Sequence, residues 1–592
     1  MEAKAPYNFI PLNSKVITYD APADFDKYQE NKHSGYIMID FITKTPFYIR
    51  GTADGEGKTC EFFAPGGIKK IPGSSIRGMV RTLVEIVSGG KFSFLEKDKR
   101  LYFRAVGESG SLGKYYRNLI KMSSVYAGVI KNKDNKYIIC PSNKFYKIRG
   151  QFIEKSFVVK YNSTNIVVEE FGFKEDIYFK EPKKNNLVFE IRDSKHDNYI
   201  KGYLVASGNI IGKNIQWIVG VPDTKHYLLI RDKVIKLYKS DNNRKKEADL
   251  LKKLETHNRG VPCFYIKEGN EVRAFGHTPY FRIPYDCSIG EHVPCCLTDD
   301  NLTDMAESIF GKPQKWASRV FFEDAEICPN QKDVSLELAL PKILSTPKPT
   351  SFQHYLEQTS DGDKKHWNNK DANIRGYKLF WHRKTPCKDN DKRQYGWSER
   401  TAIDECQKPS DEVHTLPIKP IKEGTKFKGR IRFENLSSVE LGALLFVLDL
   451  PDESDKVYCH KLGLGKPLGL GSVKITPKLF IIDRKKRYSS LFDGGDIWAL
   501  AEREYGISEY IDNFEKDMLD KMSPEDRGSA SKLWNTSRLA ILKMMLDWKK
   551  AENGGDDWLE KTRYMSIDNK EFKERAILQI QKPFIIVPLP NQ

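Results

Sequence analysis

The chain has 592 residues, of which 39% are hydrophobic, 12% aromatic and 30% charged, a composition typical of a folded protein and not of a disordered one. This length exceeds what one hydrophobic core usually supports, so we expect several domains or one core with large insertions. The 97 lysines and arginines outnumber the 80 aspartates and glutamates, giving a formal net charge of +17, and this excess favours a polyanionic partner.

The sequence predicts a cytoplasmic protein without membrane contact. Its longest apolar run, Leu441 to Leu448, is too short to cross a bilayer, and its first residues lack the apolar run of a signal peptide. The ten cysteines include no CxxC pair, so we expect reduced thiols.

A strand and a helix open the predicted fold. Residues 34–51 contain YIMIDF, which alternates like a strand that ends near Pro46. After a glycine-rich connection, residues 76–87 place apolar side chains at helical spacing, with Ser74 or Ser75 as the cap and Gly89 as the stop. This order is the first half of a βαβ unit.

A basic and aromatic stretch follows. Between Lys114 and Arg149 the chain carries nine cations, six aromatic residues and one acid, Asp134. Cations interleaved with rings suit single-stranded nucleic acid. Aromatic residues in strands also fill cores, so both interpretations stay open here.

Residues 105–275 are predicted to form an insertion domain with its own structure. Strand-like stretches such as YIIC, SFVVKY, NIVVEEF and YLLI lead into a charged helical run at residues 240–257. Residues 276–330 are assigned to the continuing core. Residues 331–417 have poor periodicity and many polar residues, which predicts long loops or a thumb-like projection.

A cysteine and histidine cluster lies just after the insertion. Cys287, His292, Cys295 and Cys296, with His277 nearby, are residue types that bind Zn²⁺ tetrahedrally. Their spacing matches no standard zinc motif, so the alternative is a set of free thiols and a structural histidine.

The strand and helix pattern returns near the end of the chain. GTKFKGRIRFENL alternates like a strand, SSVELGALLFVLDL has a helical cap and periodicity, and a glycine-rich loop leads into the strand-like GSVKITP. Residues 1–104 and 418–480 would together form the two halves of a ferredoxin-like, α+β core with helices on one face. Residues 481–592 are predicted to be helical and to pack on the core or on a partner.

The glycine-rich loop, HKLGLGKPLGLGSVKI, fits neither nucleotide-binding fingerprint. Pro467 replaces the hydroxyl that a P-loop needs after its lysine, and the loop precedes a strand where the dinucleotide motif would precede a helix. Two readings remain: a structural turn, or a loop whose glycines and two lysines, Lys461 and Lys466, approach an extended polyanion.

Four stretches in this order resemble a known family: IPGSSIRGMVR, IFGKPQKWASRVFFEDA, ENLSSVELGALLFVLDL and the glycine-rich loop. They are similar to the signatures of the repeat-associated mysterious protein (RAMP) superfamily of CRISPR systems, in particular to a backbone subunit of type III effector complexes. APYNFIPLNSKVI and IRGYKLFWHRK resemble a long variant with a large insertion. The insertion and the C-terminal helices lie outside the resemblance.

The resemblance implies an RRM-like core that holds guide RNA, helps to position target RNA and assembles with other effector subunits. RNA binding of this kind requires no cofactor. It also implies the RNA-contacting residues, at the first helix and in the glycine-rich loop: Ser74, Ser75, Arg77, Arg81, Lys461, Gly463, Gly465, Lys466, Gly469 and Gly471.

Two enzymatic alternatives and one non-enzymatic alternative stay open. Some relatives cut target RNA with an aspartate after the first strand, and Asp54 is the candidate here, with Mg²⁺ as its metal. Its neighbour Gly55 favours an ordinary turn. His33 and His460 would serve an endoribonuclease that processes precursor guide RNA. The third alternative is an adaptor without RNA contact.

Overall fold

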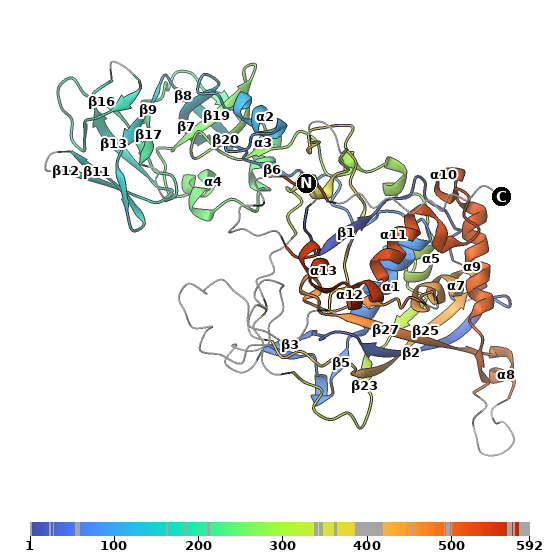
Figure 1. Cartoon of the computed structure of the whole chain (residues 1–592). Coiled ribbons are helices and arrows are strands. Elements are labelled where there is room, and N and C mark those ends of the chain that lie inside the picture. Colours follow the sequence, from blue (N-terminus) through green and yellow to red (C-terminus); the bar gives the residue numbers. More distant parts are fainter. Residues whose placement is uncertain are drawn as a thin grey trace, which may run out of the picture.

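The chain folds into two lobes, a larger one that contains both termini of the described chain and a smaller one that projects from it (Figure 1). The computed structural model describes residues 3–22, 25, 27, 29–53, 60–161, 164–182, 185–209, 214–336, 341, 347–359, 364–384, 418–451, 453, 455–490, 492, 498, 500–564, 571 and 575–578. Within these ranges, every helix is too short or too polar to cross a bilayer.

The larger lobe is built on an antiparallel sheet around the central strand β2 (His33–Thr43). β2 pairs with β25 (Lys426–Leu436) on one side and with β27 (Ser472–Ile482) on the other. β22 (Val320–Phe322) and β23 (Ala325–Ile327) pair with the far edge of β25. This sheet is the ferredoxin-like core that the sequence predicts, in an α+β fold.

Two helices cover one face of this sheet (Figure 1), α1 (Gly73–Val87) after β2 and α7 (Ser438–Leu448) after β25. The alternation in each strand turns apolar side chains such as Phe427 and Ile431 toward these helices, where they are fully buried. α9 (Ser508–Lys521) packs on α7.

The two core helices begin differently. Ser437 and Glu440 form a reciprocal capping box at α7, as the sequence predicts. At α1 the predicted serine cap is wrong, because the cap position is Pro72 and the Gly73 amide donates to Asp324 Oδ1 at 2.8 Å. Asp324 from a distant segment takes over the role that a local serine usually has.

The remaining strands of the larger lobe are short. β28 (Glu502–Tyr505) pairs with β27, in a stretch for which the sequence pattern predicts helix. That prediction is wrong because the free edge of β27 offers backbone partners that outweigh local helical periodicity. The others are β3 (Arg50–Ala53), β4 (Cys60–Phe62), β5 (Lys70–Ile71) and β26 (His460–Lys461).

The described part of the C-terminal region otherwise consists mainly of helices, as predicted. Its helices besides α9 are α8 (Arg484–Ser489), α10 (Pro524–Arg527), α11 (Ser537–Leu546), α12 (Trp548–Asn553) and α13 (Gly555–Lys561). α11 is buried against the core, where Arg538 donates to the carbonyl of Ile86 at the end of α1 at 2.6 Å.

Part of the predicted projection at residues 331–417 instead packs on the larger lobe. β24 (Tyr377–Phe380) pairs antiparallel with β1 (Tyr7–Ile10), and α6 (Phe352–Tyr355) lies earlier in the same segment. IRGYKLFWHRK and APYNFIPLNSKVI, far apart in sequence, therefore form one two-stranded sheet. Residues 385–417 lie outside the described residues.

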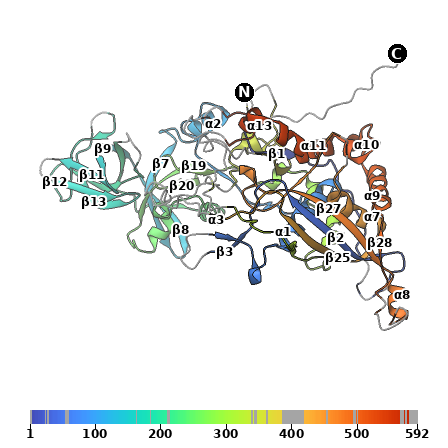
Figure 2. The same ribbon diagram turned by 60° about the horizontal axis from the view of Figure 1, so that its bottom comes forward.

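The smaller lobe corresponds to the insertion and extends away from the core sheet in both views (Figures 1 and 2). One of its sheets has five strands: β7 (Val125–Lys133), β8 (Lys136–Ser142), β18 (Leu228–Leu229), β19 (Val261–Glu268) and β20 (Glu271–Gly276). A second has six: β9 (Phe145–Arg149), β13 (Phe173–Phe179), β14 (Leu187–Val188), β15 (Ile191–Arg192), β16 (Ile200–Val205) and β17 (Ile215–Gly220). A third has three: β10 (Gln151–Ile153), β11 (Ser156–Tyr161) and β12 (Thr164–Glu169).

Three helices complete the insertion: α2 (Ser111–Leu119), α3 (Asp232–Lys239) and α4 (Leu250–Leu254). The prediction of a helix over residues 240–257 is wrong for the first half of that range. The Asp249 side chain accepts from the amides of Leu251 and Lys252, so α4 starts only there and the preceding residues form turns.

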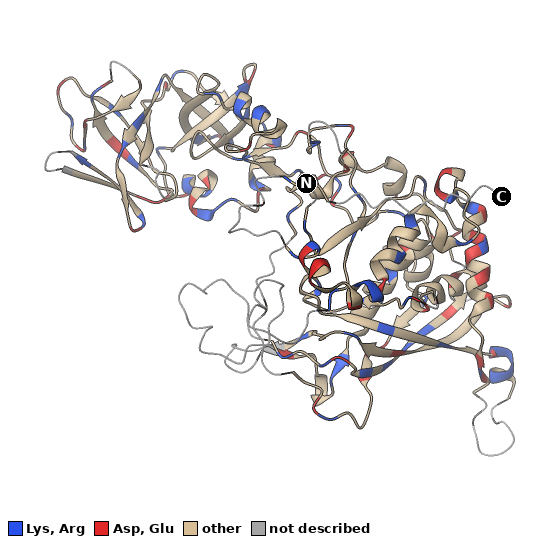
Figure 3. Ribbon diagram, in the orientation of Figure 1, with Lys and Arg blue, Asp and Glu red and all other residues tan. Residues whose placement is uncertain are grey.

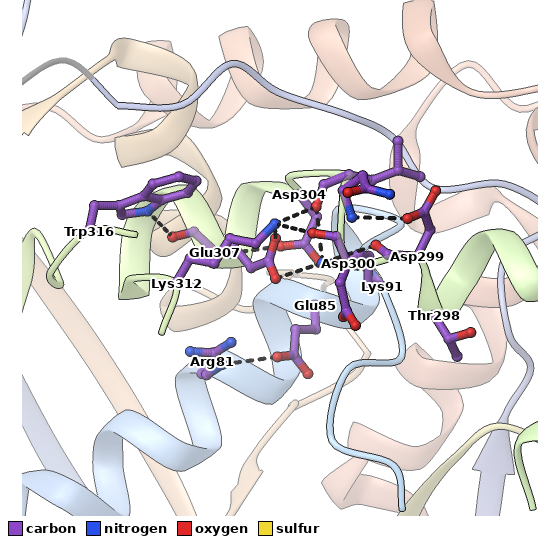
Figure 4. A network of polar contacts seen from close by, with 12 residues as sticks. Arg81, Glu85, Lys91, Thr298, Asp299, Asp300, Asp304, Glu307, Lys312 and Trp316 are labelled. Atoms are coloured by element: carbon purple, nitrogen blue, oxygen red, sulfur yellow. Dashed lines mark hydrogen bonds and ion pairs between the residues drawn. The ribbon is translucent and has the colours of Figure 1, made fainter. Parts of the chain in front are cut away.

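Two features join the chain segments on either side of the insertion. β6 (Tyr102–Phe103) pairs with β21 (Ile283–Pro284), where the chain enters and leaves the smaller lobe. Figure 4 shows a polar network beside α5 (Met305–Phe310), in which the buried Lys91 ammonium lies 2.7 Å from Glu307 and donates to the Leu302 carbonyl. Lys312 binds the same carboxylate at 3.2 Å, which fixes the segment after α1 to the segment before β22.

Candidate nucleic-acid interface

The sheet face opposite α1 and α7 carries a row of cations on β25. Every second side chain of this strand is exposed, and four of these are basic, Lys426, Lys428, Arg430 and Arg432. β27 contributes two more exposed lysines on the same face, Lys474 and Lys478. We call these six residues, together with the half-buried side chains of β2 between them, the basic sheet face. The β2 side chains are Tyr36, Met38, Ile42 and one acid, Asp40.

The strand register places the two rows of cations on either side of β2. Met38 lies between Arg430 and Lys478, and Ile42 lies between Lys426 and Lys474. Neighbouring strands are about 4.8 Å apart, so the two rows are roughly 10 Å apart. A polyanion lying along β2 would meet cations on both sides.

An aromatic pair closes one end of this face. Tyr36 on β2 and Phe480 on β27 stack with ring centroids 4.9 Å apart and planes 15° apart. The Arg430 guanidinium lies over the ring of Tyr36, at 5.7 Å from its centroid. RRM domains use aromatic side chains on such a sheet face to stack unpaired RNA bases.

The acids near this face neutralise only part of the charge. Glu323 accepts hydrogen bonds from both Arg430 and Arg432 at 3.0 Å. Within the described ranges, none of the four lysines lies within 4.0 Å of a carboxylate oxygen. These ammonium groups are therefore available to phosphate oxygens. α8, which follows β27, adds a further group of Lys and Arg residues, coloured blue in Figure 3.

The sequence carries a signal for this face in addition to the family-like motifs. KFKGRIRF alternates cation and core residue over one strand, so all four cations must share one face. The alternation predicts a strand, but these four cations are not among the predicted RNA contacts. Lys474 and Lys478 lie on the same face because of the register between β27 and β2. No local sequence pattern predicts that register.

The four predicted RNA contacts at α1 differ in whether RNA could reach them. Ser74 is exposed and Ser75 half-buried in the first turn of the helix, where a phosphate could reach both. Arg77 instead donates to the Phe310 carbonyl at 2.8 Å, and Arg81 donates to Glu85 at 3.0 Å. Burial, and then the charge of Arg81, lower the pKa of Arg77. Both arginines thus bind within the protein.

The glycine-rich loop is held tightly by the core. Gly463, Gly465, Gly469 and Gly471 all have positive φ, which explains why each is glycine. The amides of Leu464 and Gly471 donate to the carbonyls of Tyr48 and Pro46. Gly469 and Gly471 are buried, whereas Leu464 is 51% exposed. Only the turn around Leu464 is open to a ligand.

The two loop lysines point back into the loop. The Lys461 ammonium donates to the carbonyls of Gly469 and Leu470 at 3.2 and 2.9 Å, and that of Lys466 donates to Gly463 at 2.6 Å. Burial, followed by the nearby charges of Arg383 and Lys466, lowers the pKa of Lys461 well below its usual value. In this geometry the two lysines stabilise the loop, and phosphate contact at the loop remains a prediction for the Gly463–Gly465 turn.

The segment after β24 fixes the same loop from its other side. The His382 ring bonds Ser472 Oγ at 2.9 Å and the Cys459 carbonyl at 3.0 Å. Arg383, which is buried, donates to the Pro467 carbonyl at 2.9 Å. The motif IRGYKLFWHRK therefore shapes the glycine-rich loop.

The basic stretch at residues 114–149 separates into core rings and surface cations. Tyr116 and Tyr146 are buried, whereas Lys114, Arg117 and Lys133 are exposed. Tyr126 is 40% exposed and stacks on Tyr265. The rings mainly build the insertion, and the cations form a solvated surface.

The candidate metal and catalytic residues are not assembled into a site by the described structure. His292 bonds backbone carbonyls through both ring nitrogens, to Ala372 at 2.8 Å and to Trp367 at 3.0 Å. Both nitrogens are thereby occupied, and no three potential ligands gather among the described residues, so Cys287, His292, Cys295 and Cys296 form no zinc site there. Asp54 lies outside the described residues.

The two histidines proposed for acid and base catalysis lie at opposite ends of the sheet. His33 pairs with Leu436 at the start of β2, whereas His460 pairs with Val473, the partner of Thr43 at its end. At about 3.4 Å per residue this separation is roughly 30 Å. His460 is buried, and its Nε2 donates to the Val447 carbonyl at 2.7 Å. They do not form one catalytic pair.

Comparison with known proteins gives one family. A model of the RAMP superfamily matches residues 229–474, from β18 in the insertion to the start of β27. No curated protein matches the sequence. One similar solved chain comes from a cryo-EM structure of the type III-B Cmr-beta complex bound to cognate target RNA. It is 8% identical, and the match covers 75% of this chain and 98% of that chain at a TM-score of 0.18.

Proposed function

We propose that the chain, whose residues 229–474 match a model of the RAMP superfamily, is a RAMP protein and an RNA-binding subunit of a type III CRISPR effector ribonucleoprotein. In this proposal it holds guide RNA, helps to position target RNA and contacts other effector subunits. The basic sheet face is the RNA-binding surface, and the exposed turn of the glycine-rich loop is a second contact.

The observation that carries this proposal is a set of four lysines, without carboxylate partners among the described residues, beside a stacked aromatic pair on an RRM-like sheet. Phosphates of a single strand would bind Lys426, Lys428, Lys474 and Lys478. An unpaired base would stack on the Tyr36 and Phe480 rings. Such a surface binds single strands with little sequence preference, which suits guides of varying sequence.

Within the described residues, no specific observation favours the two enzymatic alternatives. His33 and His460 are far apart, and no acid cluster lies beside the basic sheet face that could hold a metal ion. The adaptor alternative predicts no RNA affinity, so one binding experiment separates it from the proposal.

The test measures binding of a single-stranded RNA to the purified chain by fluorescence polarisation over a range of salt concentrations. We expect log Kd to rise with log salt at a slope of about 0.7 per neutralised phosphate. Changing Lys428, Lys474 and Lys478 together to Gln should reduce that slope by about 2. Lys516→Gln, an exposed lysine on α9, is the matched control and should leave it unchanged. Absent or salt-independent RNA binding would contradict the proposal and favour the adaptor.

A further inference from the structure

The insertion lobe contains a cavity that the basic sheet face does not include. Its volume is about 400 Å³, within the size range of small-molecule sites. It lies where β20, the turns between α3 and α4, and the loops after β12 and β16 meet. The pocket therefore joins two of the insertion's sheets.

Cations predominate in the cavity wall. Arg104, Arg244, Lys245 and Arg282 line it, against one acid, Glu170, whose carboxylate accepts from the Asn209 amide at 2.6 Å. Behind the cavity wall, the buried Asp241 carboxylate forms ion pairs with two of the arginines, at 2.9 Å from Arg282 and 3.9 Å from Arg244. In the described part of the chain, Arg104 and Lys245 have no carboxylate within 4.0 Å. The site thus has net positive charge that an anionic ligand would neutralise.

Aromatic rings lie next to these cations. The Arg244 guanidinium lies 3.4 Å from the centroid of the Tyr238 ring, and Tyr238 stacks on Phe275 at 4.2 Å with planes 8° apart. Lys245 lies over the Phe171 ring at 4.9 Å. A guanidinium already held over a ring is suited to stack on a planar heterocycle as well as to bind phosphate.

A buried polar atom in the wall has no partner. His277 lines the cavity and is 5% exposed, and its Nε2 donates to the Ala206 carbonyl at 2.7 Å. Its Nδ1 then carries a lone pair, and that atom has no hydrogen-bond partner among the described residues. Burial, and then the charge of Lys253, lower the pKa of His277 to about 3, so the ring is neutral at pH 7. A neutral acceptor of this kind suits a sugar hydroxyl or a base N–H.

We propose that this cavity binds a nucleotide, with its phosphate at Arg104 and Lys245 and its base beside Arg244 and Tyr238. Two sources share this chemistry, a free nucleoside monophosphate and the phosphorylated end of an RNA strand. The site is separate from the basic sheet face, so binding of a mononucleotide does not depend on the proposed function of that face.

The test is isothermal titration calorimetry of the full chain with each of the four ribonucleoside 5′-monophosphates, with orthophosphate and with adenosine. We expect saturable binding of at least one monophosphate, at least tenfold tighter than orthophosphate or adenosine. The variant Arg104→Gln/Lys245→Gln should weaken it at least tenfold. Both side chains are exposed, so the fold should be retained, which a thermal melt checks.

Two controls make the result specific. Lys246→Gln changes the next, exposed lysine, which does not line the cavity, and should alter binding less than twofold. The triple lysine variant of the basic sheet face should bind mononucleotide normally even if it no longer binds RNA. Competition by a short 5′-phosphorylated RNA against its unphosphorylated form shows whether the natural ligand is an RNA end or a free nucleotide. The proposal is overturned if no monophosphate binds saturably, or if orthophosphate alone binds as tightly.

Discussion

Tyr36 and Phe480 stack on each other across β2 and β27, with ring centroids 4.9 Å apart, at one end of the basic sheet face. Both side chains are half-buried, and the Tyr36 hydroxyl donates to Glu502 at 2.9 Å. The pair is therefore held in place before any ligand binds. A preformed aromatic platform lowers the entropic cost of stacking a base.

Replacing both rings by leucine should weaken single-stranded RNA binding without changing its salt dependence. Loss of base stacking costs about 1–3 kcal/mol per base, and no phosphate contact is removed. The measurement is the polarisation titration at several salt concentrations. Tyr36→Phe keeps the ring and loses only the hydrogen bond to Glu502, so its affinity should stay within about twofold of the wild type, a change of less than 1 kcal/mol. An unchanged affinity in the double leucine variant would show that no base stacks there.

Changing Lys461 to methionine should lower stability and leave the salt slope of RNA binding unaltered. Its ammonium donates to two loop carbonyls, at 3.2 and 2.9 Å, which would lose their partner. A buried polar group left without a hydrogen bond costs about 1–3 kcal/mol. Urea denaturation measures this loss. A reduced salt slope in a variant of unchanged stability would instead assign Lys461 to RNA, as the resemblance alone implies.

The ferredoxin-like core could be predicted from the sequence because its strands and helices each carry their own periodicity. β2, α1, β25, α7 and β27 all lie where the patterns place them. The pairing of β1 with β24 could not be predicted, because two short strands so far apart in the chain leave no local signal. The same holds for Asp324, which replaces a serine cap at α1.

The candidate interface was predictable only in part, for a related reason. Composition and motifs indicate RNA and a glycine-rich loop, but the direction of a lysine side chain depends on which carbonyls the fold brings near it. Lys461 and Lys466 find acceptors in their own loop. Lys428 and Lys478 have no such acceptor in the described part of the chain and remain exposed on the sheet.

The buried pair of Arg319 and Glu440 should be essential for stability. The two side chains bond each other, including one contact of 3.1 Å, and link the segment after α5 to the start of α7. Although burial opposes ionisation, the hydrogen bonds from Arg319 lower the pKa of Glu440. Glu440→Gln keeps the capping geometry but leaves the buried guanidinium without its counter-charge, which should cost about 3–5 kcal/mol. Chemical denaturation tests this. Loss of less than 1 kcal/mol would mean that water enters the site and replaces the carboxylate.

Burial of His460 should make the fold less stable in acid. Desolvation lowers its pKa to about 4 in the folded chain, against a usual value of 6.5. Between these values the unfolded chain binds the proton more readily, so the free energy of unfolding should fall as pH drops from 6.5 to 4, by roughly 1.4 kcal/mol per pH unit.

His460→Gln isolates this effect from the other titrating groups. Its side-chain amide can donate to the Val447 carbonyl as Nε2 does, but it carries no titratable proton. The Glu85 carboxyl, whose pKa burial raises to about 7, titrates equally in both proteins. Urea titration from pH 7 to 4 measures the free energy of unfolding of the wild type and of the variant. The difference between the two values at each pH is therefore the contribution of His460. Below pH 6.5 the free energy of unfolding of the variant should rise steadily relative to that of the wild type. Parallel plots of the two free energies against pH would show that the folded structure accepts a charged His460.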